Sequence, residues 1–147
     1  MPLDPSYVGH RYPPTVPYLV GREKIREFAE AIGADEPAYL DPEAARALGH
    51  PDVIAPPTFA MVLTETGMRT MIDDPGLGLD FSRVLHGDQR FSYARPVRAG
   101  DRLSCVTIIE EITSRAGNAF LTSRTEILDE AGERIVTAWS KLVVRGE

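Results

Sequence analysis

A chain of 147 residues with 43% hydrophobic residues and a formal net charge of −6 has the composition of one globular domain with a sizeable core. The acidic balance and the lack of a basic run argue against nucleic acid or an anionic membrane as a partner. Cys105 is the only cysteine, which excludes an internal disulfide and a cysteine-based metal cage. No apolar run approaches the ~20 residues of a membrane span, and the first residues lack the features of a signal peptide. We therefore expect a single domain over residues 1–147 that works in the cytoplasm.

The first part of the chain is rich in proline and tyrosine, and we expect residues 1–15 to run extended over the surface. The apolar run at residues 16–20 follows and predicts a short strand. Pro17 lies within this run and cannot donate to a ladder, which restricts the strand to the edge of a sheet.

Two helices are predicted next. From Arg22 to Ile32, apolar residues recur at helical spacing, which indicates a helix with one apolar face. Asp41 can cap a second, shorter helix, and Gly49 ends it. The link between the two helices, residues 33–40, has the composition of a loop.

The most apolar helix is predicted near the centre of the chain. Pro56 and Pro57 extend the backbone, and Thr58 can then cap the first free amides of a helix that runs to about Ile72. Residues 59–64 are apolar almost all round, and a helix of this kind is stable only when other elements wrap it.

From residue 81 onward the hydrophobic period changes to two, which predicts strands. We expect four of them, at 83–95, 103–112, 119–128 and 135–144. The links after the second and third strands have hairpin length and contain glycine. The chain has its predicted helices first and its predicted hairpins after them. This order indicates an α+β protein with an antiparallel sheet that wraps the central helix.

The predicted sheet has apolar residues on both faces. On the second strand, alternation places Cys105 and Ile109 on one face, and Val106 and Ile108 on the other. Because one helix covers only one face, we expect a dimer in which two sheets join edge to edge.

The residues alone offer few candidates for chemistry. The three histidines, His10, His50 and His86, lack the spacing of metal ligands, so we expect no metal and no cofactor. His86 is the best acid–base candidate, because imidazole titrates near neutrality. Asp88 lies two residues further on, and alternation places it on the same strand face, where it could orient the ring. We favour a structural or interface role for His86 over a catalytic one.

Five separated motifs occur in an order that resembles the MaoC-like dehydratases of the hot-dog fold. They are residues 22–29 (REKIREFA), 41–45 (DPEAA), 55–59 (APPTF), 86–91 (HGDQRF) and 95–101 (RPVRAGD). The resemblance covers about residues 7–144 and is closest to small actinobacterial proteins allied to the non-catalytic subunits of (3R)-hydroxyacyl-ACP dehydratase. It implies an antiparallel sheet curled around one long helix, here residues 58–72, and a role in fatty-acid metabolism.

Active members of this family carry a Gly-Asp-x-Asn-Pro-x-His motif before the short helix. Gly33 and Pro37 match it, but Ala34 stands at the aspartate position, Glu36 at the asparagine and Tyr39 at the histidine. Alanine cannot hold a proton, and a phenol with a reference pKa of ~10 is a poor general base near neutrality. The resemblance thus implies that the usual Asp–His dyad is absent.

Three functions follow from the resemblance. The leading one is a subunit of a 3-hydroxyacyl-thioester dehydratase or enoyl-thioester hydratase, which pairs with a catalytic hot-dog partner and helps to form the acyl tunnel. The alternatives are a homodimer that binds acyl thioesters without turnover, and an autonomous hydratase that uses His86. In each case the ligand would be an acyl-CoA or an acyl carrier protein thioester. The candidate substrate-binding residues are Tyr39, Pro57, Thr58, Phe59 and Gln89.

Overall fold

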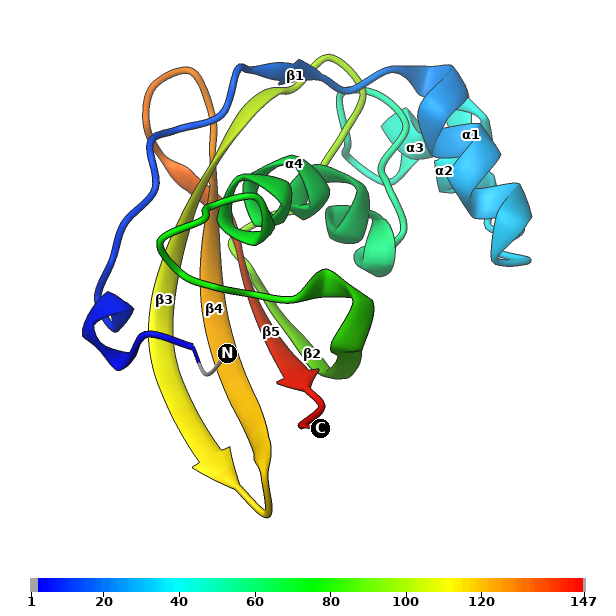
Figure 1. Ribbon diagram of the computed structural model, residues 1–147. Coiled ribbons are helices and arrows are strands. Elements are labelled where there is room, and N and C mark those ends of the chain that lie inside the picture. The colour runs from blue at the N-terminus through cyan, green and yellow to red at the C-terminus, as the bar shows by residue number, and fades with distance from the viewer. Residues whose placement is uncertain (1–2, 147) are drawn as a thin grey trace.

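The computed structural model describes residues 3–146, so Met1, Pro2 and Glu147 of the predicted 1–147 domain lie outside it. A five-stranded antiparallel sheet curls around one helix, α4 (Ala60–Ile72), and three shorter helices gather beyond the start of α4 (Figure 1). The predicted α+β architecture, with the sheet wrapped around a central helix, is confirmed.

The shorter helices follow their sequence signals closely. Helix α1 (Arg22–Ala31) buries Ile25 and Ala29 on its apolar face. Helix α3 (Pro42–Ala47) is capped as predicted, because the Asp41 carboxylate accepts a hydrogen bond from the backbone N–H of Glu43. The loop expected between them is instead partly helical: α2 (Pro37–Leu40) begins at a proline, which is well suited to a first helical position.

The entry into α4 differs from the prediction. A 3₁₀ turn, Pro57–Phe59, precedes the helix, and Thr58 lies inside this turn. The residue at the N-cap of α4 is therefore Phe59, and no side chain caps the helix. The predicted cap by Thr58 is wrong, because Pro57 starts the helical turn one residue earlier than the cap required.

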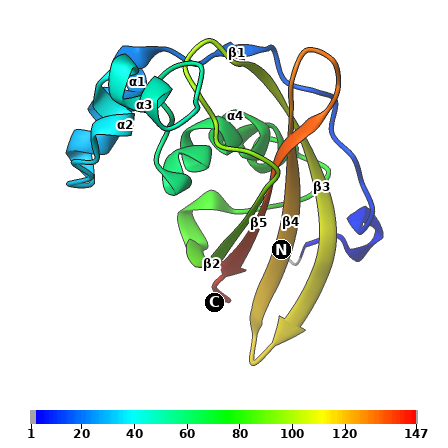
Figure 2. The same cartoon turned by 180° about the vertical axis from the view of Figure 1, so that it is seen from behind.

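The strands are β1 (Tyr18–Leu19), β2 (Val84–Tyr93), β3 (Arg102–Arg115), β4 (Asn118–Leu128) and β5 (Arg134–Val144). Their order in the sheet is β1-β3-β4-β5-β2, so β3, β4 and β5 form the two predicted hairpins. Strand β2 does not pair with its successor β3. The connection 94–101 crosses over, and β2 pairs with β5 at the opposite edge, as the view from behind also shows (Figure 2).

The N-terminal segment covers the β3 edge of the sheet. Backbone N–H groups of Gly9, Tyr12 and Thr15 donate to carbonyl groups of β3 at 2.7 to 3.0 Å. Tyr12 is also buried, so this segment is part of the fold and does not simply run over the surface as predicted. Further along, β1 pairs with β3 at the edge, as Pro17 indicated. Within residues 3–146, β2 has a strand partner on one side only.

The core consists of two clusters of buried side chains. One lies between α1, the start of α4 and the sheet, and the other lies between the end of α4, the N-terminal segment and the far ends of the strands. Val106 and Ile108 are already buried within the single chain. These two residues therefore give no reason to expect a dimer, and the dimer stays a prediction. No helix within residues 3–146 is long and apolar enough to cross a bilayer.

Candidate functional site

A pocket of about 430 Å³ lies where α2 meets the end of β2. Its lining residues are Tyr39, Ile54, Ala55, Pro57, Tyr93, Ala94, Arg95 and Pro96. Two of the predicted binding residues, Tyr39 and Pro57, come together here. The pocket therefore includes Tyr39, which stands at the histidine position of the family motif, but not Ala34, which stands at the aspartate position.

Backbone hydrogen bonds hold the wall of this pocket. The N–H of Ile54 donates to the carbonyl of Ala38 at 3.1 Å, which ties the wall to α2. The N–H of Ala55 donates to the carbonyl of Val97 at 2.7 Å, which ties it to the segment after β2. Tyr39 follows Ala38 on α2 and is buried against this wall.

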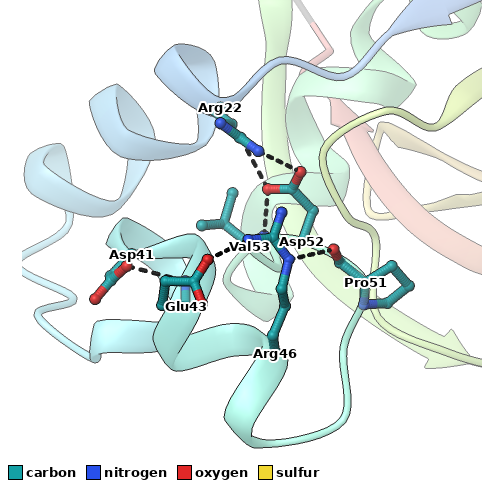
Figure 3. A network of polar contacts seen from close by, with 7 residues as sticks. All are labelled: Arg22, Asp41, Glu43, Arg46, Pro51, Asp52 and Val53. Carbon is teal, nitrogen blue, oxygen red and sulfur yellow. Dashed lines mark hydrogen bonds and ion pairs between the residues drawn. The ribbon is translucent and has the colours of Figure 1, made fainter.

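A polar network fixes the loop that leads into the wall (Figure 3). Arg22, the first residue of α1, donates two hydrogen bonds to the Asp52 carboxylate at 2.9 and 2.8 Å. This arginine holds the pKa of Asp52 below its usual value. From α3, Arg46 donates to the carbonyl of Pro51 at 3.3 Å. Helices α1 and α3 thus anchor the same loop from two sides.

Two phenol hydroxyls, of Tyr39 and Tyr93, are the neutral hydrogen-bonding side-chain groups of the pocket. Burial and the nearby charge of Glu36 raise the pKa of Tyr39. Burial also raises the pKa of Tyr93 to about 12, and its hydroxyl donates to the carbonyl of Pro57. Both phenols therefore stay protonated near neutral pH, and the hydroxyl of Tyr93 is already engaged as a donor to Pro57. None of the lining residues is a carboxylate or an imidazole.

Arg95 brings the only cationic side chain to the lining of the pocket. Its guanidinium donates to both carboxylate oxygens of Asp101 at 2.9 Å, which fixes its position and compensates its charge. Position 34, where the family carries aspartate, is a partly buried alanine packed against the core. The residues that line the pocket therefore supply no general base.

The remaining predicted binding residues lie elsewhere. Phe59 is fully buried and packs edge-on against Phe28, with ring centroids 5.5 Å apart. Thr58 is exposed and does not line the pocket, and Gln89 lies further along β2. Sequence reasoning did not assign Tyr93 to the site. The alternation of residues along β2 predicts the face on which Tyr93 lies. Its position beside Tyr39 depends on the packing of β2 against α2, two segments that are far apart in the sequence.

A bulge in β2 changes the environment of His86. The pairing with β5 shifts between His86 and Asp88, so that His86 lies opposite Leu142 while Asp88 lies opposite Lys141. Leu142 is buried beneath α4 and Lys141 is exposed, so the two residues of β2 face opposite sides of the sheet. The prediction that Asp88 orients His86 is wrong. The partner of the ring is Gln89, whose Oε1 lies 3.1 Å from His86 Nε2.

His86 lines a second cavity of about 260 Å³, beside α4. The other lining residues are Met61, Met68, Ile72, Phe81, Val84 and Leu142. This cavity shares no lining residue with the Tyr39 pocket. At ~3.3 Å per residue, the stretch of β2 from His86 to Tyr93 separates the two by roughly 20 Å. The structure therefore does not bring His86 and Tyr39 of one chain together.

The other histidines and the cysteine do not form a site. His10, His50 and His86 do not converge, and within residues 3–146 no three metal-ligating side chains lie together. Cys105 is buried, and burial raises the pKa of its thiol to about 12. Its Sγ lies 3.1 Å from the carbonyl oxygen of Leu63, which fits the predicted role as a small core residue.

Comparison with known proteins gives consistent matches over nearly the whole chain. The sequence profile of the FAS1-like, dehydratase domain region matches residues 6–138. A UPF0336 protein of Streptomyces coelicolor is 66% identical over 145 residues, which make up 99% of this chain and 97% of that protein.

Two solved structures share both the fold and appreciable sequence identity. One is a chain of the truncated HadBC (3R-hydroxyacyl-ACP dehydratase) complex from Mycobacterium tuberculosis, with a TM-score of 0.84 and 32% identity over 93% of this chain and 96% of that one. The other is a MaoC-like dehydratase, with a TM-score of 0.84 and 36% identity over 96% of this chain. The matched region makes up 43% of the length of that dehydratase. The chain therefore belongs to the FAS1-like dehydratase domain family and has the hot-dog fold of the MaoC-like dehydratases.

Proposed function

We propose that this chain is a subunit of a 3-hydroxyacyl-thioester dehydratase or enoyl-thioester hydratase, and that a catalytic hot-dog partner supplies the Asp–His dyad. The observation that carries this proposal is the Tyr39 pocket, which stays open but is lined by two neutral phenols and no general base. The HadBC dehydratase, which is 32% identical, is itself a complex. We also propose that residues 1–147 act as one domain in the cytoplasm.

The open edge of β2 is the surface proposed for the partner. Phe81 is 61% exposed and Leu85 is 50% exposed, which is high for large apolar side chains close to the open edge of a sheet. A second hot-dog subunit that adds its own strand to β2 would cover both residues and enclose the cavity beside α4. In that arrangement the cavity of this subunit would extend the acyl tunnel of its partner.

In this proposal, Tyr39 and Pro57 contact the thioester end of an acyl-CoA or an acyl carrier protein substrate. The protonated phenol of Tyr39 can donate a hydrogen bond to a carbonyl oxygen, which binds the thioester without taking a proton from it. No metal or cofactor takes part in the proposed role.

The proposal is tested by mixing the chain with a hot-dog subunit from the same organism that has an intact Gly-Asp-x-Asn-Pro-x-His motif. Hydration of crotonyl-CoA and of longer enoyl thioesters is followed for each protein alone and for the mixture. We expect this chain alone to be inert and the mixture to exceed the partner alone. Rapid turnover by this chain alone would contradict the proposal.

The second candidate function is a homodimer that binds acyl thioesters without turnover. The same open, base-free pocket favours it. A stable homodimer in sedimentation, together with no gain of activity on mixing, would support this candidate in place of the paired dehydratase.

A further inference from the structure

A third cavity, of about 440 Å³, lies at the end of the sheet that is remote from the Tyr39 pocket. It lies between the 3₁₀ turn Phe81–Arg83 that precedes β2, the tip of the β3–β4 hairpin and the residues that follow β5 (Figure 1). It shares no lining residue with the Tyr39 pocket or with the cavity beside α4. Its volume falls within the range of ~300–1,000 Å³ that is typical of ligand pockets.

Contacts with the backbone fix two arginines that line this cavity. The guanidinium of Arg83 donates to the carbonyl oxygen of Gly146 at 2.9 Å. In return, the backbone N–H and the Nε of Arg145 donate to the carbonyl oxygen of Arg83 at 3.0 and 3.4 Å. The terminal nitrogens of Arg145 make no hydrogen bond among residues 3–146. They are therefore free to bind a ligand in the cavity.

Asn118 adds a donor whose orientation is determined by its partner. Its Oδ1 accepts a hydrogen bond from the backbone N–H of Gly146 at 2.9 Å. A backbone N–H can only donate, so the atom that faces it must be the carboxamide oxygen. The NH₂ group of Asn118 then has no partner among residues 3–146. A Cβ atom at Gly146 would collide with the carbonyl oxygen of Gly117, so a glycine is required for this close approach to the hairpin.

The charges that line the cavity do not cancel. Arg83 pairs with Asp80 at 3.4 Å, and the Asp80 carboxylate also accepts hydrogen bonds from the hydroxyl and the N–H of Ser82. Arg145 has no carboxylate partner among residues 3–146. One positive charge is thus left uncompensated in a concave region of a chain whose formal net charge is −6. A cation in such a cleft raises the local concentration of anions.

We infer that this cavity binds the phosphate group of an organic phosphate, and that the guanidinium of Arg145 and the NH₂ group of Asn118 are its donors. Guanidinium groups match phosphate oxygens well, because their N–H donors form a planar fork. The cavity is larger than a phosphate group, and Leu3, Ala119 and Val144 give it an apolar wall for the organic part. The inference does not rest on the proposed function, because it follows from contacts within the chain.

Titration calorimetry with AMP and with adenosine tests the site. We expect AMP to bind and adenosine, which lacks the phosphate, not to bind. Arg145→Gln removes the charge, whereas Asn118→Asp keeps an acceptor for Gly146 and replaces the donor with a carboxylate oxygen. Each substitution should weaken the binding of AMP about tenfold or more, because hydrogen bonds to charged groups are among the strong ones.

Arg115→Gln is the matched control. Arg115 is an exposed residue of the same hairpin that does not line the cavity, and the variant loses the same charge as Arg145→Gln. It should leave the binding of AMP unchanged. No saturable binding of AMP to the unmodified chain, or an equal loss in both arginine variants, would overturn the inference. If Asn118→Asp does not fold, Arg145→Gln is sufficient, because it keeps the backbone hydrogen bond to Arg83.

Adenosine 3′,5′-bisphosphate distinguishes two sources of the phosphate group. It reproduces the nucleoside end of CoA, whereas AMP represents a free nucleotide. Tighter binding of the bisphosphate than of AMP, lost in Arg145→Gln, would assign the site to CoA, and equal binding of the two would assign it to a free nucleotide. Neither probe is a thioester, so these titrations do not depend on the mixing assay, and failure of the proposed function is recognised separately.

Discussion

The hydroxyl of Tyr12 donates a hydrogen bond to the Asp74 carboxylate at 2.9 Å, across 62 residues of sequence. It joins the N-terminal segment, which covers the β3 edge, to the loop that follows α4. Tyr12→Phe removes this bond and keeps the ring. We expect a loss of about 1 kcal/mol in the free energy of unfolding, measured by denaturant titration. Tyr7→Phe is the control, since the hydroxyl of Tyr7 makes no side-chain hydrogen bond among residues 3–146. A loss of the same size in the control would show that the Asp74 contact is not responsible.

Leu63 and Met61 lie two residues apart on α4 and should respond differently to truncation. Leu63 is buried in the core, so Leu63→Ala should cost about 2–5 kcal/mol of stability. Met61 lines the open cavity, so Met61→Ala should cost about 1 kcal/mol or less in the isolated chain. Denaturant midpoints measure both effects. Similar midpoints for the two variants would mean that α4 is rotated relative to the sheet.

Tyr93 should make the fold sensitive to alkali. Its pKa rises from 10.0 to about 12 on folding, so the folded chain binds its proton more tightly than the unfolded chain does. The resulting contribution to stability is complete below pH 10 and is lost as the pH rises from about 10 to about 12. In Tyr93→Phe the fall in stability over this range should be less steep, as measured by the urea midpoint at each pH. An identical slope in both proteins would contradict the raised pKa.

Restoring the dyad tests how far the Tyr39 pocket has diverged. Ala34→Asp combined with Tyr39→His should give measurable hydration of crotonyl-CoA by the chain alone, because each general acid or base commonly contributes about 10²–10⁴-fold. Either substitution alone should have little effect, since one group positions the water and the other exchanges the proton. If the double variant folds and binds the substrate but stays inert, the loop geometry of the pocket is not that of active family members.

Some features that depend on neighbouring residues are predicted well from the sequence, although the cap at Thr58 is not. The cap at Asp41 and the apolar face around Ile25 are local signals, and both are confirmed. The face of His86 was predicted wrongly, because the bulge is fixed by the pairing of β2 with β5, which is remote in sequence. Strict alternation therefore gave His86 the wrong neighbour, Asp88 in place of Gln89.

Residues of the candidate site can likewise be predicted where a local motif marks them, and not where a distant contact places them. Tyr39 could be found because it occupies a position in a motif that spans a few residues. Tyr93 could not be assigned a role, because it reaches the site through a contact with Pro57, which is far away in the chain. Contacts of this kind leave no periodic signal in one sequence.

The N-terminal segment along β3 limits how many further strands the sheet can add. Because backbone groups of Gly9, Tyr12 and Thr15 already occupy part of that edge, β2 is the strand whose outer edge stays open along its length within residues 3–146. If two such chains pair through β2, strand addition ends at that pair and does not continue into a fibre. Removal of the segment would expose backbone groups of β3 as a second open edge. We therefore expect the truncated chain to add strands at both edges and to assemble into fibres.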